Sequence, residues 1–293
     1  MTTAAEANPD PVVVPARVLH RYEAFSLYNS PYPAHDTGCA IDLYPGGGRD
    51  RAVPAPSPVA GTVTHVRTVR APPKAYAAAD DHLIVVDTGD RLARVLHVDP
   101  TVDSGDVVAV GDSLGPLVRS GYFAPWVDNH LHLGFRPADG HPLRATGSLP
   151  IEPAVDVVAV PWDGTGTVVE TAETFVRLDA PAHPASGETF AGVAAGPTAA
   201  HGALDGGLPH YAGGGRLAGS ADDPAVTVAG RRVGTAAGRT VTWDDVTVRV
   251  NGVPVTGLSF APQRDRLGVK IVSWDGVSVA VGDHVRVTVE TDD

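Results

Sequence analysis

Short valine-rich apolar runs alternate with turn residues along most of the chain. In residues 21–160 they include Gly61–Val66, Leu83–Asp87 and Ala93–Val98, each bounded by Gly, Pro, Asp or Thr. Runs of this length and composition, separated by turn formers, are typical of β-strands. Only Lys74–Ala79, which follows two prolines, has a pattern that a short helix could adopt.

The two ends of this region differ from it. Residues 1–20 are predicted to be an N-terminal arm that contains a short strand at Val12–Val14. Residues 161–224 begin with strand-like runs and continue into an Ala, Gly, Pro and His-rich stretch from Ala180 to Ala221, which predicts long loops or a linker.

The strand pattern returns over residues 225–293, with alternating runs such as Val246–Val250 and Val285–Val289. Asn251-Gly252, between two apolar runs, predicts a two-residue hairpin turn. Because one face of such alternating strands must be buried, this tail is predicted to be a small β-sandwich or barrel-like region.

Composition supports an all-β fold class. The 293 residues include 33 glycines and 26 prolines, and 43% of them are hydrophobic, which is enough for a sizeable core. The single cysteine, Cys39, excludes a disulfide within the chain.

The charge balance narrows the range of partners. A net charge of −12 argues against nucleic acid or an anionic membrane as partner, because both would repel the chain. Lys74 and Lys270 are the only lysines. Abundant aspartate with arginine in place of lysine suggests a halophilic archaeon as the source. The sequence shows neither a signal-peptide pattern nor an apolar stretch of membrane-spanning length, so we expect a cytoplasmic protein.

Histidines supply the first candidate chemistry. In the run Asn129–Phe135, His130 and His132 are two residues apart, so on a strand both side chains point to one face. Leu131 and Leu133 then point to the core. Such a pair can reach one metal ion, although two histidines on a wet sheet face would give the same pattern.

Three other residues lie in suggestive surroundings. Asp42 falls within the apolar run that follows His35, and a buried carboxylate needs a metal, an arginine or backbone N–H groups as a partner. His97 lies between apolar residues at a predicted strand end, where a histidine of the core would look the same.

The order of these segments resembles that of lysostaphin/LytM-type zinc metallopeptidases. That family has a His and an Asp on an early strand, then a Pro-Val-x-Ala segment, a Tyr-x-His-Leu strand, a glycine-containing turn and a final His-Leu-His strand. The corresponding stretches here, within about residues 20–150, are Ser57–Val63, Arg94–Val98, Val102–Gly115 and His130–Phe135.

The resemblance implies an antiparallel β core of the duplicated-hybrid-motif type and a single Zn²⁺ ion. Asp42 and His132 match metal ligands of the family. His97 and His130 match its two catalytic histidines, which orient water and stabilise the oxyanion. The implied activity is hydrolysis of a peptide or another amide by water that the metal activates, and it should fall at acid pH because the ligand histidines must be neutral.

One position departs from the family pattern. Its first histidine ligand stands four residues before the aspartate, where this chain has Gly38. The nearest histidine is His35, and the seven residues from it to Asp42 would span about 23 Å in a straight strand and reverse its face. His35 can therefore be the third ligand only if the intervening residues turn back, for which Asp36-Thr37-Gly38 is suitable. Cys39, Asp36 or no metal at all are the alternatives.

Other functions remain open at this point. A catalytically degraded relative could serve as a binding or scaffold module. Biotinyl or lipoyl carrier domains have similar strands, but Lys74 lacks the flanking residues of an attachment site. A sugar phosphotransfer domain with paired histidines would leave Asp42 unexplained. His201 and His210 lie in glycine-rich sequence and are interpreted as loop residues.

Overall fold

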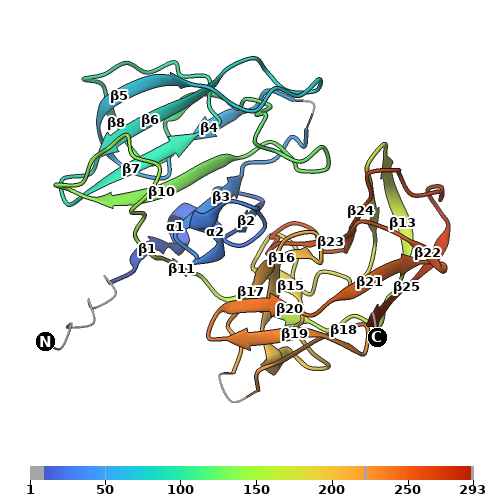
Figure 1. Cartoon of the computed structure of the whole chain (residues 1–293). Coiled ribbons are helices and arrows are strands. Elements are labelled where there is room, and N and C mark those ends of the chain that lie inside the picture. The colour runs from blue at the N-terminus through green and yellow to red at the C-terminus, as the bar shows by residue number, and fades with distance from the viewer. Residues whose placement is uncertain (1–9, 50, 221–222, 292–293) are drawn as a thin grey trace, which may run out of the picture.

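The computed structural model describes residues 10–49, 51–220 and 223–291. The fold is all-β, as predicted, with two groups of strands that correspond to the two halves of the chain (Figure 1). The helical segments among the described residues are single turns: α1 (Ala16–Leu19), α2 (Pro33–Asp36) and the 3₁₀ turn η1 (Ala199–His201). No helix in this part of the chain has the length and apolar character needed to cross a membrane.

Antiparallel pairing builds the main sheet of the N-terminal half. In spatial order its strands are β2 (Ala24–Ser26), β3 (Ala40–Tyr44), β10 (Leu131–Pro137), β7 (Arg91–Leu96), β6 (Asp81–Asp87), β5 (Gly61–Val69) and β8 (Val107–Val108). Strand alternation directs Ile41, Leu43, Leu131 and Leu133 into the core, where each is fully buried. The opposite face of β3 and β10 is thereby left to polar side chains.

Two small pairs complete this half. β4 (Pro54–Pro56) pairs with β9 (Ser113–Pro116), and β1 (Val12–Pro15) lies parallel to β11 (Ile151–Ala154). The predicted strand in the N-terminal arm is therefore present, and α1 follows it, whereas residues 1–9 of that arm lie outside the described residues. Lys74–Ala79 forms a turn instead of the short helix that its pattern allowed, with Lys74 and Tyr76 both bonded to the carbonyl of Phe123.

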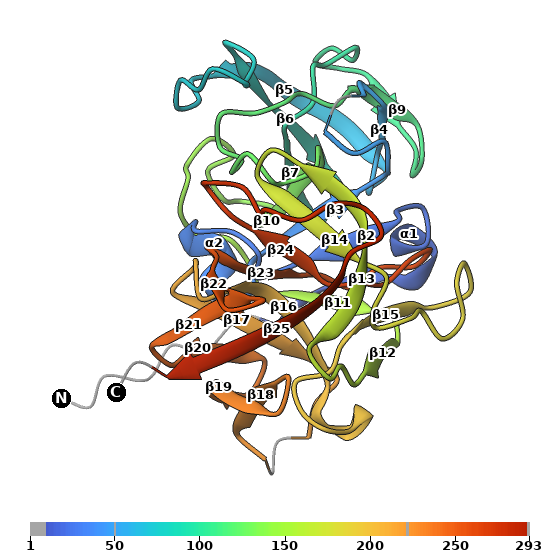
Figure 2. The ribbon, with the colours of Figure 1, turned by 90° about the vertical axis from the view of Figure 1, so that its right-hand side faces the viewer.

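A second antiparallel sheet dominates the C-terminal half (Figure 2). In spatial order it contains β18 (Ala225–Val228), β19 (Arg231–Ala237), β20 (Thr240–Trp243), β17 (Gly213–Leu217), β16 (Ala203–Leu208), β23 (Gly257–Phe260), β24 (Lys270–Val272), β14 (Phe175–Leu178), β13 (Thr165–Ala172), β25 (His284–Thr291), β21 (Val246–Val250) and β22 (Val253–Pro254). β12 (Val157–Val160) pairs in parallel with β15 (Phe190–Val193). Asn251 and Gly252, both with positive φ, form the predicted hairpin turn between β21 and β22.

The stretch predicted to be loops or a linker contains β15, β16 and β17, which corrects that expectation. Its small residues serve close packing. A Cβ at Gly215 would lie 2.1 Å from the ring of Tyr28, and one at Gly214 would lie 2.3 Å from the ring of Trp243. Low side-chain volume here makes room for large aromatic neighbours from elsewhere in the chain, which the local sequence does not reveal.

The two halves share apolar contacts. Phe190 and Leu217 of the C-terminal half belong to the main core of the N-terminal half. The rings of Phe190 and Phe25 meet edge to face with centroids 5.0 Å apart. A smaller cluster joins Trp126 to Phe175 and Val272. The C-terminal half therefore packs against the loops that border the polar face of β3 and β10.

Candidate metal centre

Asp42 and His132 are brought together by strand register. The two residues are directly opposite each other in the antiparallel pair of β3 and β10, so their side chains share a face. His132 Nδ1 lies 3.0 Å from Asp42 Oδ1. Asp42 is 3% exposed, so this carboxylate is buried among histidine side chains.

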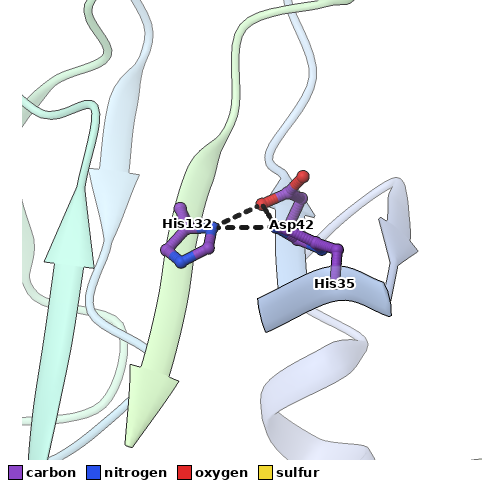
Figure 3. Close-up of side chains that lie close together, drawn as sticks. All are labelled: His35, Asp42 and His132. Carbon is purple, nitrogen blue, oxygen red and sulfur yellow. Dashed lines mark hydrogen bonds and ion pairs between the residues drawn. The ribbon is translucent and has the colours of Figure 1, made fainter. Parts of the chain in front are cut away.

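His35 reaches the same place from α2 instead of from a strand (Figure 3). Its Nε2 lies 3.1 Å from His132 Nδ1 and 3.4 Å from Asp42 Oδ1. Its Nδ1 donates a hydrogen bond of 2.8 Å to the carbonyl of Leu27, which leaves the Nε2 lone pair directed at the centre. The turn needed to bring His35 back toward Asp42 is thus supplied by a short helix and the residues after it.

Gly38 explains why no histidine stands four residues before Asp42. It has a φ of +64°, and a Cβ there would lie 2.7 Å from the hydroxyl of Tyr28. A side chain at this position would be strained and crowded. Cys39 Sγ accepts a hydrogen bond from Thr37 Oγ1. Neither Cys39 nor Asp36 belongs to the cluster, so among these candidates only His35 lies with Asp42 and His132.

The donor set fits a zinc ion. Ligand bonds of about 2.0–2.1 Å in a tetrahedron place neighbouring ligand atoms about 3.3–3.4 Å apart. The three donor atoms here are separated by 3.0, 3.1 and 3.4 Å. Two imidazole nitrogens and one carboxylate oxygen also form a typical donor set for a zinc site that keeps one position open.

His130 lies beside this cluster on the same sheet face. Its Nδ1 donates a hydrogen bond of 2.9 Å to the carbonyl of Asp128, and its Nε2 is 3.4 Å from Asp42 Oδ2. The ring packs against Phe123 and Tyr44, with centroid distances of 4.2 and 4.8 Å. His130 is therefore held rigidly, with its second nitrogen facing the centre.

His97 completes the group from the end of β7. It has a φ of +71°, an uncommon conformation for a residue with a side chain, and one that accumulates at functional sites. Its Nδ1 is 2.6 Å from Asp81 Oδ2. The His97 ring centroid lies 5.5 Å from that of His130 and 6.0 Å from that of His132.

Asp81 is a site residue that sequence reasoning missed. Its carboxylate is fully buried, and it also accepts hydrogen bonds from Ser120 Oγ and from the backbone N–H groups of His82 and His97. The available signal was a carboxylate just before an apolar run, whereas Asp42 was singled out because it lies inside one. Its partner, Ser120, lies too far away in sequence to be anticipated.

Electrostatics favour neutral rings around an ionised carboxylate. Burial raises the pKa of Asp42, but His35, His130 and His132 outweigh burial and hold that pKa well below its usual range. Burial lowers the pKa of His130 to about 4, and likewise that of His132, against the opposing effect of Asp42. Neutral imidazole is the form that binds a metal.

The centre lies at a small cavity that is partly open to solvent. The cavity beside it has a volume of about 30 Å³, room for only one or two water molecules. Residues 29–32 and 122–124 form part of its lining, and Tyr211 contributes from the C-terminal half. His201 and His210 do not line this cavity. The ring centroid of His210 lies 5.5 Å from that of Trp126, which belongs to the segment whose Phe123, Ala124 and Val127 line the cavity.

Comparison with solved structures finds M23 peptidases. The catalytic domain of lysostaphin from Staphylococcus simulans is 19% identical, over 43% of this chain and 89% of that one, with a TM-score of 0.29. A mutant catalytic domain of the prophage-encoded M23 protein EnpA from Enterococcus faecalis is 18% identical, over 38% of this chain and 74% of that one, with a TM-score of 0.27. A zinc-containing peptidase from Vibrio cholerae is 20% identical, over 43% of this chain and 36% of that one, with a TM-score of 0.26.

No curated protein matches this chain. Residues 13–153 match the family model described as the N-terminal domain of a domain of unknown function, DUF8155. Residues 158–290 match the C-terminal domain of the same family. Both halves of the chain are therefore similar, in order and over nearly their whole length, to the two domains of this one family.

Proposed function

We propose that this chain is a zinc-dependent amide or peptide hydrolase whose metal ligands are His35, Asp42 and His132. The observation that supports this most directly is the spacing of the three donor atoms, 3.0 to 3.4 Å, in a buried site. A zinc ion with an open position supplies a Lewis acid that activates water and polarises a carbonyl.

The surrounding histidines divide the proton chemistry between them. Asp81 accepts the Nδ1 proton of His97, so His97 Nε2 carries a lone pair and can accept the proton of the attacking water. The Asp81 carboxylate would then stabilise the protonated ring. His130, whose Nδ1 proton goes to a backbone carbonyl, has no such carboxylate behind it. We assign the general base to His97, and the contact with the carbonyl oxygen or the leaving amine to His130.

Replacement of the strand ligand tests the proposal. In His132→Ala, the donor opposite Asp42 is lost, so both stoichiometric zinc and hydrolysis of a pool of quenched fluorescent oligopeptides should disappear. Zinc is measured by elemental analysis of the purified protein. The control is His141→Ala, since His141 is exposed and lies outside the cluster. If His132→Ala retained one zinc per chain, this ligand set would be ruled out.

A non-catalytic metal-binding scaffold is the second candidate. The small volume of the cavity favours it, because about 30 Å³ does not admit a peptide without movement of the surrounding segments. The same assays separate the two functions. One bound zinc with no hydrolysis of any peptide in the pool would favour the scaffold, whereas zinc-dependent cleavage would exclude it.

A further inference from the structure

A much larger cavity lies between the two halves of the chain. It has a volume of about 510 Å³, within the range of small-molecule sites, and Gly46–Gly48, Tyr44 and Asp128 line it from the N-terminal half. β14, β23 and β24 contribute residues from the C-terminal half. Asn29 and Val127 border both this cavity and the small one at the candidate metal centre.

Basic side chains are concentrated in its walls. Arg51, Arg177, Arg266 and Lys270 line the cavity, although the chain has only 22 lysines and arginines and a net charge of −12. Arg177 and Lys270 are only 5% and 7% exposed. Burial of a cation is unfavourable unless it is paired, so this concentration requires compensating anions.

The anions present only partly compensate. Asp128 Oδ2 is shared by Lys270 Nζ at 3.3 Å and Arg177 Nη2 at 3.5 Å. Glu170 Oε2 is shared by Arg177 Nε at 3.1 Å and Arg266 Nη1 at 3.9 Å. Three cations therefore share two carboxylates. Two further acids line the cavity. Asp265 pairs with Arg264, which does not line the cavity, and the charge of Glu23 is offset by the fourth cation of the lining, Arg51. Over the whole lining, four cations therefore face three carboxylates other than Asp265.

Lys270 retains donor capacity. Its ammonium group has three protons and makes one hydrogen bond to a side chain, while it lies 4.2 Å from the centroid of the Phe175 ring. Burial lowers the pKa of Lys270 to about 8 despite Asp128, which agrees with incomplete compensation of its charge. One additional negative charge would balance the cluster.

We propose that this cavity binds a small polar molecule through a carboxylate held by Lys270 and Arg177. A singly charged group fits the deficit, whereas Asp128 and Glu170 would repel a doubly charged phosphate. Asn29, Ser259 and Gln263 supply hydroxyl and amide groups for the uncharged part of the ligand. This inference is independent of the proposed hydrolysis.

Calorimetric titration of the full chain tests it. The probes are N-acetyl-triglycine, its C-terminal amide and inorganic phosphate. N-acetyl-triglycine should bind, and the amide, which lacks the charge, should bind at least tenfold more weakly. Equal binding of acid and amide, no binding of the acid at millimolar concentration, or preferential binding of phosphate would overturn the proposal.

Matched variants localise the binding. Lys270→Met should weaken binding of the acid at least tenfold, whereas Lys74→Met changes the other lysine of the chain and should leave it intact. Unchanged binding in Lys270→Met would overturn the proposal, because the acid would then bind at another site. The cluster of His35, Asp42 and His132 is one such site, and Lys270→Met leaves it intact. Arg266→Gln changes an arginine whose side chain is 54% exposed, where the change should not impair folding. It should weaken binding several-fold compared with Arg232→Gln at an exposed position away from the cavity.

Discussion

At the residue scale, Asp81 determines which nitrogen of His97 faces the candidate metal centre. Its Oδ2 takes the Nδ1 proton, while its Oδ1 accepts two backbone N–H groups. The carboxylate thus fixes both the tautomer and the orientation of the ring. It acts through His97 and is a positioning residue.

Asp81→Asn should reverse that tautomer. Because the amide oxygen would stay with the backbone N–H groups, its NH₂ would face His97 Nδ1 and force the ring proton onto Nε2. We expect kcat for oligopeptide hydrolysis to fall by about 10²–10⁴, the usual contribution of general acid–base catalysis, with zinc content unchanged. Nitrogen NMR of the imidazole would report the tautomer independently of activity.

The matched control is Asp90→Asn, because the Asp90 side chain is 77% exposed. It should leave kcat and the His97 tautomer as they are in the unchanged protein. If Asp81→Asn kept kcat within a factor of about three, the assignment of His97 as general base would be wrong.

At the element scale, β16 positions the segment before α2. Asp205 on β16 accepts hydrogen bonds from Ser26 Oγ and from the N–H groups of Leu27 and Tyr28. The carbonyl of Leu27 in turn receives the Nδ1 proton of His35. A carboxylate of the C-terminal half is therefore two hydrogen bonds away from a candidate metal ligand.

Asp205 should also make stability depend on pH. Burial raises its pKa to about 7, so between about pH 4 and pH 7 the folded chain holds a proton that the unfolded chain has lost. The contribution of this group to stability is complete below about pH 4 and is lost as the pH rises through 7. Asparagine cannot ionise. Its amide oxygen can accept the N–H groups of Leu27 and Tyr28, and its NH₂ group can donate to Ser26 Oγ.

Asp205→Asn should consequently gain stability relative to the unchanged protein as the pH rises. We expect the difference in Tm, variant minus unchanged protein, to increase by about 5 °C or more between pH 5 and pH 8. Thermal unfolding followed by circular dichroism measures it, with Asp275→Asn at an exposed position as control. A difference that does not vary with pH would show that Asp205 is already ionised at pH 5.

At the scale of the whole molecule, the C-terminal half contributes to the wall of the cavity at the candidate metal centre. Tyr211 lines the small cavity directly. Trp274, which is 60% exposed, lies edge-on to the buried Trp126 with ring centroids 4.7 Å apart. It thereby supports residues 123–127, a segment that lines part of the cavity. Access to the metal should depend on this contact even though Trp274 is not near a ligand.

Trp274→Ala should loosen the segment that contains Trp126 without changing the candidate ligands. The rate at which a chelator removes zinc should rise several-fold, while the equilibrium affinity for zinc stays the same. Stopped-flow mixing with a chromogenic chelator gives the rate, and Val281→Ala, at another exposed apolar position, is the control. Equal rates in the two variants would mean that the Trp126 segment does not limit access.

Local periodicity was sufficient to predict most strands and the shared face of two candidate site residues. Strand alternation alone placed His130 and His132 on one face and identified Asp42 as a buried carboxylate in need of a partner. Most strands and the hairpin at Asn251-Gly252 follow from the same local rules, because β-branched residues and turn formers act over a few positions. The all-β class was therefore determined by the sequence itself.

Contacts between distant segments were decided only by the tertiary structure. The glycines of β16 and β17 predicted a linker from sequence, whereas in the structure two of them pack against the rings of Tyr28 and Trp243. Asp81 and Asp205 act through partners that lie tens of residues or more away, and His35 reaches Asp42 only because α2 reverses the chain. The physical reason is that alternation and turn chemistry depend on neighbours in sequence, whereas register, burial and donor spacing arise from residues that only folding brings together.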